Sequence, residues 1–123
     1  MPGDPRQSLG KLGEDLACRE LIRRGYAIHA RRYRTRVGEL DIVARDGETL
    51  VFVEVKARAS DRCGSAADAV TAWKRRRLVL MASDYLARNG LSDAPCRFDV
   101  VAVELGARPV VTVYPSAFTR QLT

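Results

Sequence analysis

Two short acidic segments near the middle of the chain carry the residues best suited to chemistry. Glu39 and Asp41 lie in the first segment, and Glu54 and Lys56 lie in the second. Carboxylate oxygens are ligands that Mg²⁺ prefers, and two carboxylates that share a site need a metal, a proton or an ammonium group to balance them. These residues therefore predict a site in which a divalent cation or Lys56 offsets the acidic charge. The simpler interpretation is the solvated polar face of a hairpin with an internal ion pair, which requires no function.

A β-hairpin would place these segments side by side. Residues 37–45 and 49–58 alternate in the manner of strands around Asp46-Gly47, a strong two-residue turn signal. With that dipeptide as the loop, Glu39 faces Glu54 and Asp41 is its diagonal neighbour. One face then carries Glu39, Asp41, Val43, Phe52, Glu54 and Lys56, and the other carries Leu40, Ile42, Ala44, Val51, Val53 and Val55. Because the second face is wholly apolar, the pattern favours a register of this parity.

A third carboxylate, Glu14, lies on a predicted helix. Ser8 is expected to cap this helix, which runs to about Arg24 and ends at Gly25. The helical neighbours of Glu14 are small or apolar, namely Gly10, Ala17, Cys18 and Leu21. A carboxylate in such a stripe is costly without a partner, which favours a functional role. The alternative is a charge at the margin of an imperfect amphipathic helix, because Leu9, Leu12 and Leu16 form a second apolar arc.

A run of four cations opens the second long helix, which Thr71 is expected to cap and which runs to about Arg88. The run comprises Lys74, Arg75, Arg76 and Arg77. Cations at a helix N-terminus are unfavourable by about 0.3 to 1 kcal/mol each, and a bound phosphate would relieve that cost. Lys74 precedes the apolar stripe Leu78, Met81, Ala82 and Tyr85, so it is expected to face inward while its arginine neighbours face solvent. A solubilising basic run is the alternative.

Another basic group, around Tyr33, directly precedes the hairpin: Arg31, Arg32, Arg34 and Arg36. Arginines with an interleaved aromatic side chain suit phosphate contact and base stacking. The alternative is a solvated strand edge that charge protects from pairing with another chain.

Length and composition indicate one globular domain with a basic surface. The chain has 123 residues with 46% hydrophobic side chains, which supports one ordinary core, and its formal net charge of +6 suggests a polyanionic partner. We find no apolar run of membrane-spanning length and no signal-peptide start, so the expected location is the cytoplasm, without membrane association. The three cysteines are spaced too far apart for a zinc or redox motif and are expected to be reduced; His29 is assigned no role.

The expected element order is αβββαββ, an α/β fold with a mixed sheet and helices packed against it. Besides the hairpin, strands are predicted at 26–33, 98–105 and 110–114, and the second helical region begins near Ala66. We expect a flexible N-terminus over 1–8, one domain over 9–118 and a tail over 119–123, with a linker-like stretch at 60–65.

The whole set of motifs resembles the restriction-endonuclease-like nucleases of the PD-(D/E)XK superfamily and, within them, the bacterial YraN-type family. The resemblance spans Leu9 to Phe118 and is carried by Gly13-Glu14, Gly25-Tyr26, Gly38 to Asp41, Asp46-Gly47, Leu50 to Lys56, Gly64, Val70 with Lys74, and Arg97 to Val101. Two positions depart from the pattern: Leu40 stands where the superfamily motif often has Pro, and Arg32 where the YraN-type pattern usually has Asn.

The resemblance implies a restriction-endonuclease-like mixed sheet in which Asp41, Glu54 and the Val55 carbonyl bind Mg²⁺ or Mn²⁺. It implies that Glu14 supports the metal or its water, and that Lys56 steadies the attacking water or the scissile phosphate. Asp99 resembles a family position too, and we interpret it as structural. Related resolvases pair as dimers, so a homodimer is expected by analogy.

The sequence thus predicts a Mg²⁺-dependent endonuclease that acts on nucleic acid, with DNA as the expected substrate. The residues proposed to bind nucleic acid are Arg31, Arg34, Arg36, Lys74, Arg75 and Arg76. Two alternatives remain: an accessory protein that keeps the nuclease fold but only binds nucleic acid, and a basic surface that contacts protein or RNA in a structural assembly.

Overall fold

The computed structural model describes residues 5–59 and 71–118 and has the predicted element order. The elements are α1 (Pro5–Arg23), β1 (Ala27–Thr35), β2 (Gly38–Asp46), β3 (Thr49–Arg58), α2 (Ala72–Arg88), β4 (Cys96–Glu104) and β5 (Val110–Phe118). The stretch at 60–65, the helical start near Ala66, Cys63 and the tail over 119–123 fall outside the described residues. Cys18 and Cys96, which are described, are free thiols as expected.

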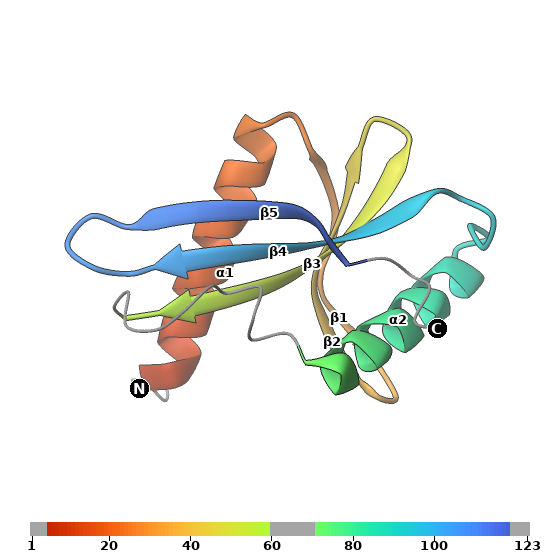
Figure 1. Ribbon diagram of the computed structural model, residues 1–123, viewed down its shortest axis with the longest axis horizontal. Coiled ribbons are helices and arrows are strands. Elements are labelled where there is room, and N and C mark those ends of the chain that lie inside the picture. Colours follow the sequence, from red (N-terminus) through yellow and green to blue (C-terminus); the bar gives the residue numbers. More distant parts are fainter. Residues whose placement is uncertain (1–4, 60–70, 119–123) are drawn as a thin grey trace.

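The five strands form one mixed sheet in the order β1-β2-β3-β4-β5. Neighbouring strands are antiparallel except β3 and β4, which pair in parallel from Leu50↔Cys96 to Arg58↔Glu104. A parallel pair needs a crossover connection, and α2 lies in that connection. In Figure 1, α1 crosses behind β3, β4 and β5, whereas α2 lies beside β1 and β2. The prediction of a mixed sheet flanked by helices is confirmed.

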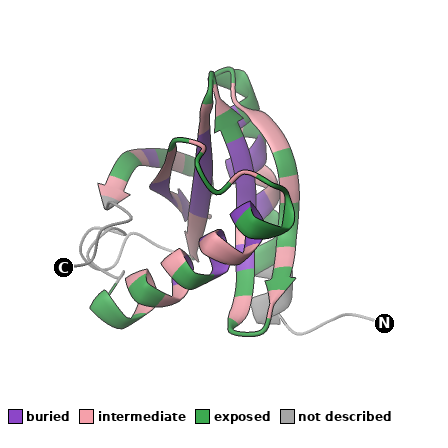
Figure 2. Cartoon of the chain, turned by 90° about the vertical axis from the view of Figure 1, so that its right-hand side faces the viewer, coloured by how far each residue is buried: buried purple, intermediate pink, exposed green. Residues whose placement is uncertain are grey.

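The apolar side chains form two cores, one on each face of the sheet, because neighbouring strand residues point to opposite faces. Figure 2 shows the buried residues running through the strands in the middle of the molecule. The core beneath α1 contains Ala17, Cys18, Leu21, Ile42, Ala44, Val51, Val53, Val101, Val103 and Val113. The core beneath α2 contains Leu40, Val43, Leu50, Phe52, Leu78, Met81, Ala82, Tyr85, Leu86, Phe98 and Val100. The predicted stripe of α2 is therefore confirmed.

The ends of the helices follow local hydrogen-bonding rules. α1 ends in a Schellman motif, in which Gly25 has φ 97° and the Tyr26 N–H donates to the Leu21 carbonyl at 2.9 Å. Thr71 caps α2, and its hydroxyl accepts the Lys74 N–H at 3.2 Å. The expected cap at Ser8 is wrong, since α1 already begins at Pro5, a residue well suited to the first helical turn. In the part of the chain that the structure describes, neither helix is long and apolar enough to cross a membrane.

The predicted hairpin is present, but its register differs from expectation by two residues. The observed pairs are Asp46↔Thr49 and Val43↔Phe52, so the loop is Gly47-Glu48 and Asp46 ends the strand. Gly47 has φ 62°, which suits glycine at the first position of a two-residue loop. Asp46 also accepts a hydrogen bond from Arg97 of β4 at 3.0 Å, which ties it to the sheet. A shift of two residues preserves the faces of both strands, so the division of polar and apolar faces survives.

Leu40 is the exception to that division. It was expected on the same face as Ile42, yet it belongs to the core beneath α2, opposite Tyr33 of β1. The pairing of β2 with β3 ends at Ile42↔Val53, so the start of β2 no longer follows the alternation of β3.

Asp99 lies in a buried polar network that also corrects the end of β5. Its carboxylate accepts from Arg97 Nε at 3.0 Å, from the Tyr26 hydroxyl at 3.2 Å and from the Ser116 N–H at 2.9 Å. β5 was predicted to end at Tyr114, the residue before Pro115, which has no N–H to donate to the ladder. The strand instead continues to Phe118, with a shift in register at Asp99, whose side chain binds the Ser116 N–H. These contacts support the structural interpretation of Asp99.

Candidate functional site

The candidate site begins where β2 and β3 separate. Asp41 immediately precedes Ile42, the first residue of β2 that pairs with β3, and its Oδ2 accepts a hydrogen bond from the Val55 N–H at 2.8 Å. If the observed register is continued by one residue, Asp41 stands opposite Glu54. The expectation that Glu39 faces Glu54, with Asp41 on the diagonal, is therefore wrong, because it assumed the other loop. The two acids are nevertheless neighbours at the fork, since the charge of Glu54 acts on the Asp41 carboxylate.

Burial makes both carboxylates of this pair hard to ionise. The pKa of Asp41 is raised from 3.8 to about 7, first by burial and then by the charge of Glu54, while the Val55 N–H opposes the shift. Burial also raises the pKa of Glu54, although Lys56, Lys74 and Arg77 favour its charged form. Because the pKa of each acid is raised, a bound cation would favour the charged form of both.

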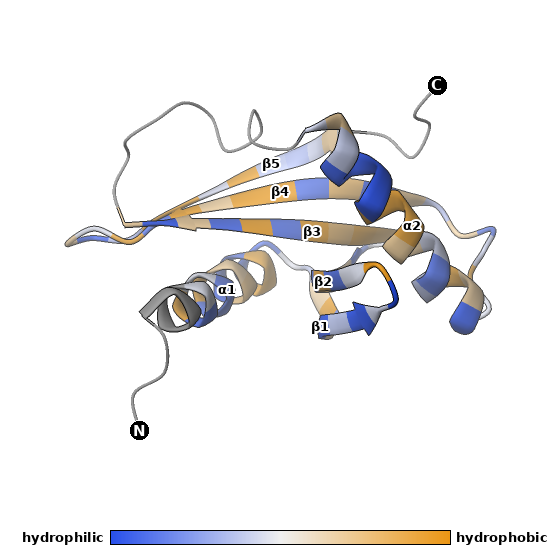
Figure 3. Cartoon of the chain, turned by 90° about the horizontal axis from the view of Figure 1, so that it is seen from below, coloured by the Kyte–Doolittle hydropathy of each residue, from blue (hydrophilic) through white to orange (hydrophobic). Residues whose placement is uncertain are grey.

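Lys56 lies on the same face as Glu54, as the sequence predicts. Its Nζ is 3.9 Å from Glu54 Oε1, and both side chains are about four-fifths shielded from solvent. Burial lowers the pKa of Lys56, and the neighbouring Lys74 lowers it further, whereas Glu54 and Asp41 act in the opposite direction. In Figure 3, β3 alternates between hydrophilic and hydrophobic residues along the half that carries Glu54 and Lys56.

A hollow of about 200 Å³ opens beside Glu54, between the hairpin and α2. Its walls are Glu39, Glu54, Lys74, Arg77, Leu78 and Met81. Lys74 thus faces the site, as predicted from its position before the apolar stripe. Arg77 was expected to face solvent with its neighbours, and that expectation is wrong. Its guanidinium lines the hollow and donates from Nε at 3.0 Å and from Nη2 at 2.5 Å to the Val37 carbonyl.

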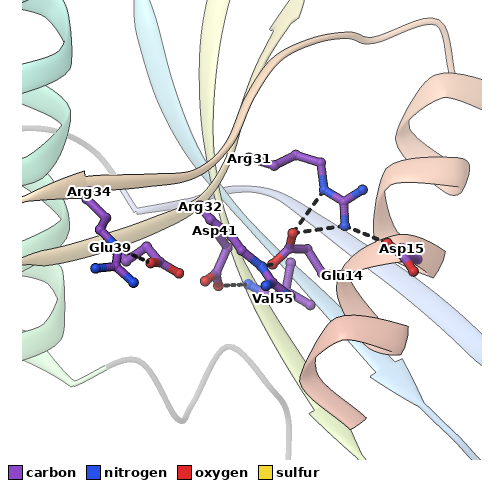
Figure 4. Close-up of polar contacts among 8 residues, drawn as sticks. All are labelled: Glu14, Asp15, Arg31, Arg32, Arg34, Glu39, Asp41 and Val55. Carbon is purple, nitrogen blue, oxygen red and sulfur yellow. Dashed lines mark hydrogen bonds and ion pairs between the residues drawn. The ribbon is translucent and has the colours of Figure 1, made fainter. Parts of the chain in front are cut away.

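Glu14 is buried, with 6% of its surface exposed, beside Ala17, Cys18 and Leu21. Gly10, one turn earlier, is exposed and does not belong to the buried stripe. The partners of Glu14 are on β1, where Arg31 Nε donates to Oε1 at 2.9 Å and Arg32 Nε donates to Oε2 at 3.2 Å (Figure 4). Both oxygens therefore accept hydrogen bonds from arginines.

Glu14 is nevertheless close to the acidic pair, since its charge contributes to the raised pKa of Asp41. Figure 4 shows Asp41 lying between Glu39 on one side and Glu14 on the other. The buried position of Glu14 was predictable from its small neighbours. Its arginine partners were not, because Arg32 reaches Glu14 from a backbone with φ 53° that no sequence pattern signals.

Five of the six residues proposed to bind nucleic acid lie on β1, the β1–β2 turn or α2 near the hollow, and one, Arg31, lies towards α1. Arg34 of β1 pairs with Glu39, which lines the hollow, at 3.3 Å, and Arg36 is exposed in the turn between β1 and β2. Lys74 lines the hollow itself, and Arg75 and Arg76 follow it on α2. Arg31 is the outlier, because it pairs with Asp15 at 2.6 Å in addition to Glu14, on the α1 side. The contact of Arg77 with Val37 joins the two basic groups that the sequence presented separately.

The expected metal ligands are the Asp41 and Glu54 carboxylates and the Val55 carbonyl, and of these residues Val55 contacts Asp41 through its N–H. Within residues 5–59 and 71–118, no three or more His, Cys, Asp or Glu side chains converge in a metal-binding group. The donors are all hard oxygens and few in number, which suits Mg²⁺ or Mn²⁺ with water in the remaining positions.

Comparison with known proteins identifies the family. A family profile described as uncharacterised protein family UPF0102 matches residues 13–103. A UPF0102 protein from Symbiobacterium thermophilum is 54% identical over 98 residues, covering 80% of this chain and 83% of its own. The chain belongs to family UPF0102. This finding confirms the family that the YraN-type resemblance predicted.

Two other UPF0102 relatives extend the match along the chain. The protein from Anaeromyxobacter dehalogenans is 48% identical over 117 residues, which covers 94% of this chain and 87% of the relative. The protein from Hahella chejuensis is 40% identical over 111 residues, or 90% of both chains. The UPF0102 profile spans Glu14, Asp41, Glu54, Lys56 and Lys74, so the candidate site lies wholly inside the family match.

Proposed function

We propose that this UPF0102 protein is a divalent-cation-dependent phosphodiesterase that cleaves nucleic acid, with DNA as its first expected substrate. The observation that carries the proposal is the pair of half-buried carboxylates, Asp41 and Glu54, beside Lys56 at the point where β2 and β3 separate. The mixed sheet, with Asp on one hairpin strand and Glu-x-Lys on the next, supports a place among the restriction-endonuclease-like nucleases.

The surroundings of the pair support a phosphate substrate. Lys74 and Arg77 line the hollow next to Glu54, and the chain carries a net charge of +6. Nucleic-acid backbones are recognised chiefly by such cations. An acidic substrate could therefore approach the carboxylates, which alone would repel it.

The residues present fit a bound Mg²⁺ or Mn²⁺. The Asp41 and Glu54 carboxylates and the Val55 carbonyl would hold it, and burial gives both acids a reason to accept a cation. Such an ion would neutralise charge on the phosphate and lower the pKa of a coordinated water. The hydrogen bond from the Val55 N–H occupies Asp41 Oδ2 and leaves Oδ1 for this role.

Lys56 is the group proposed to act on the substrate directly. In hydrolysis a water oxygen attacks phosphorus, one P–O ester bond breaks, and the departing oxygen takes a proton. An ammonium group beside Glu54 can orient the water or stabilise the charge that develops on the phosphate. The lowered pKa of Lys56 also makes its proton easier to release than that of an exposed lysine. Glu14 is proposed to support the site from α1 through its charge near Asp41.

Two further parts of the proposal concern context. A cytoplasmic location and a homodimer are predictions from the sequence and its resemblance to resolvases. Size-exclusion chromatography with light scattering would test the homodimer directly.

An accessory protein that only binds nucleic acid is the competing function. A surface that only binds nucleic acid gains nothing from half-buried acids next to its cations, which is why we favour the enzyme. Calorimetric titration with Mg²⁺ and Mn²⁺ separates the two, because a pure binding protein would show salt-dependent DNA binding without metal binding.

The decisive experiment is a cleavage assay on single-stranded, duplex and branched DNA, and on RNA, with Mg²⁺ or Mn²⁺. We expect Asp41→Ala and Glu54→Ala to abolish the cleavage that the wild type performs. Glu48→Ala is the matched control, since Glu48 is exposed at the far end of the same hairpin and should tolerate the change. Equal activity in the wild type and Glu54→Ala would show that a contaminant cleaves the substrate and would overturn the proposal.

A further inference from the structure

Trp73 is placed where an apolar side chain is least expected. It lies in the first turn of α2 with 61% of its surface exposed, more than any other large hydrophobic residue that the structure describes. It is also the single tryptophan of the sequence. Leaving an indole ring in water forgoes a large burial energy, so its exposure suggests that something else covers the ring.

The ring is held in place although it is exposed. The Arg77 guanidinium lies over it, with Cζ 4.8 Å from the ring centroid. The same guanidinium donates two hydrogen bonds to the Val37 carbonyl in the turn between β1 and β2. Arg77 therefore fixes one face of the indole against the protein. A planar group can cover only one face, and the high exposure means that the opposite face is open.

Arg77 also connects this aromatic surface to the candidate site. It lines the hollow that contains Glu54, and Lys74, the residue after Trp73, lines the same hollow. A phosphate drawn towards Lys74 and Arg77 would thus bring its neighbouring nucleotides close to the open face of Trp73. In Figure 1 this first turn of α2 is the end nearer the last residues of β3.

We infer that Trp73 stacks against an unpaired base next to the bound phosphate, and that the site therefore selects single-stranded or locally unpaired nucleic acid over intact duplex. This inference rests on the proposed function, because it assumes that the hollow receives a phosphodiester. Every base offers an aromatic face, so such stacking tolerates any sequence. In a duplex those faces are already stacked on one another and cannot reach the indole.

The charges around Trp73 favour a base over an apolar protein surface. Leu80 lies two turns along α2 and is 58% exposed, so the two residues could belong to one docking face. Arg76 and Arg77 lie between them on the helix and interrupt that apolar surface. A partner that brings both an aromatic ring and a negative charge matches this mixture.

The single tryptophan makes the inference directly measurable. Intrinsic fluorescence is recorded while a short single-stranded oligonucleotide is added in the presence of EDTA, which prevents cleavage. The matched probe is an abasic strand of the same length and phosphate count. We expect strong quenching and tight binding with the base-containing strand, and little quenching with either the abasic strand or a duplex.

Variants then assign the effect to the ring. Trp73→Ala should weaken single-strand binding about 5- to 100-fold, judged by anisotropy of a labelled strand, whereas Trp73→Phe should retain most of the affinity. Leu80→Ala, which changes a similarly exposed side chain on the same helix, should bind like the wild type. Equal affinity of Trp73→Ala and the wild type, or equal binding of abasic and normal strands, would overturn the inference.

Failure here is distinguishable from failure of the proposed function. If Glu54-dependent cleavage occurs but Trp73→Ala leaves the preference for single strands unchanged, stacking is wrong and the enzyme stands. If Trp73 is quenched by single strands but no Glu54-dependent cleavage is found, stacking stands and the enzyme is wrong.

Discussion

The Asp41 carboxylate takes the place of a backbone partner for the Val55 N–H, 2.8 Å from its Oδ2, at the fork where β2 leaves β3. The last regular pair of the two strands, counted from the hairpin loop, is Ile42↔Val53, so Asp41 and Val55 lie beyond the regular pairing. The same hydrogen bond satisfies a main-chain donor and fixes the orientation of a half-buried acid. The fork thus determines both where the sheet opens and where the acidic pair lies.

Stability should depend on the protonation of Asp41. Its pKa is about 7 in the fold against an ordinary value of 3.8, so between these values the folded chain holds the proton more tightly than the unfolded chain. The stabilisation that protonated Asp41 gives the fold is therefore complete below about pH 4 and is lost as the pH rises through about 7. Linkage sets the loss at up to about 4 kcal/mol. We expect Asp41→Asn to remove this loss, so the variant gains stability relative to wild type from pH 5 to pH 8.

Denaturant unfolding at several pH values measures this effect as the difference between the two proteins. Asp93→Asn serves as the control, because Asp93 is exposed in the connection before β4 and should follow the wild type. A difference between Asp41→Asn and wild type that does not change with pH would contradict the assignment.

Metal affinity should rise with pH for the same reason. A cation must displace the proton of Asp41, so with a pKa of about 7 we expect Mn²⁺ affinity to increase about tenfold from pH 6 to pH 8. Isothermal titration calorimetry in two buffers of different ionisation enthalpy would also detect the released proton. Glu54→Gln should lose binding, whereas Glu48→Gln should not. Affinity that is flat across this range would count against Asp41 as a ligand.

Glu14 and Asp15 both contact Arg31, but their removal should have unequal effects. The side chain of Glu14 is 8% exposed and that of Asp15 is 40% exposed. Glu14→Ala leaves the Arg31 and Arg32 guanidinium groups without their buried acceptor, and we expect a loss of about 1 to 3 kcal/mol in unfolding free energy. Asp15→Ala breaks a surface pair and should cost less than about 1 kcal/mol. Thermal denaturation of both variants tests the order, and equal losses would show that burial of Glu14 is unimportant.

Two glycines of α1 should respond oppositely to alanine. A Cβ at Gly13 would lie 2.5 Å from the Ala57 Cβ, so α1 would have to move away from β3. We expect Gly13→Ala to destabilise the fold by about 1 to 3 kcal/mol. A Cβ at Gly10 meets nothing within 4 Å, and the helix should gain about 0.5 to 1 kcal/mol from Gly10→Ala. Chemical denaturation of both variants measures the change in unfolding free energy for each. A stabilising Gly13→Ala would contradict the close approach of α1 to Ala57.

Much of the fold was predictable because its signals are local. The Thr71 cap, the apolar stripe of α2 and the alternation of the hairpin each depend on residues within a few positions. The hairpin register could not be predicted, because Asp46-Gly47 and Gly47-Glu48 can each form a two-residue loop. Both loops place the same residues on each face of the hairpin. The hydrogen bond from Arg97, which ties Asp46 to the sheet, comes from a strand far along the chain.

In the candidate site, too, the features that depend on local spacing were predictable and the others were not. Lys56 beside Glu54 follows from spacing on one strand, and the inward position of Lys74 follows from the helical stripe. The predicted pairing of Glu39 with Glu54 depended on the hairpin register and was wrong, because the observed register differs by two residues. Arg77 was missed although it lies three residues after Lys74, a helical spacing that places both on one side. Trp73 carried no local signal, because exposure of an aromatic residue depends on the whole surface.

The topology also sets the order in which opposite charges can meet as the chain folds. Asp41 and Glu54 approach each other through one short hairpin, whereas Lys74 and Arg77 arrive only when α2 docks in the connection to β4. Short-range contacts form sooner than long-range ones. Lys56 is already beside Glu54 on the hairpin, so only Lys74 and Arg77 arrive later. We expect refolding followed by stopped flow to quicken as ionic strength or Mg²⁺ concentration rises.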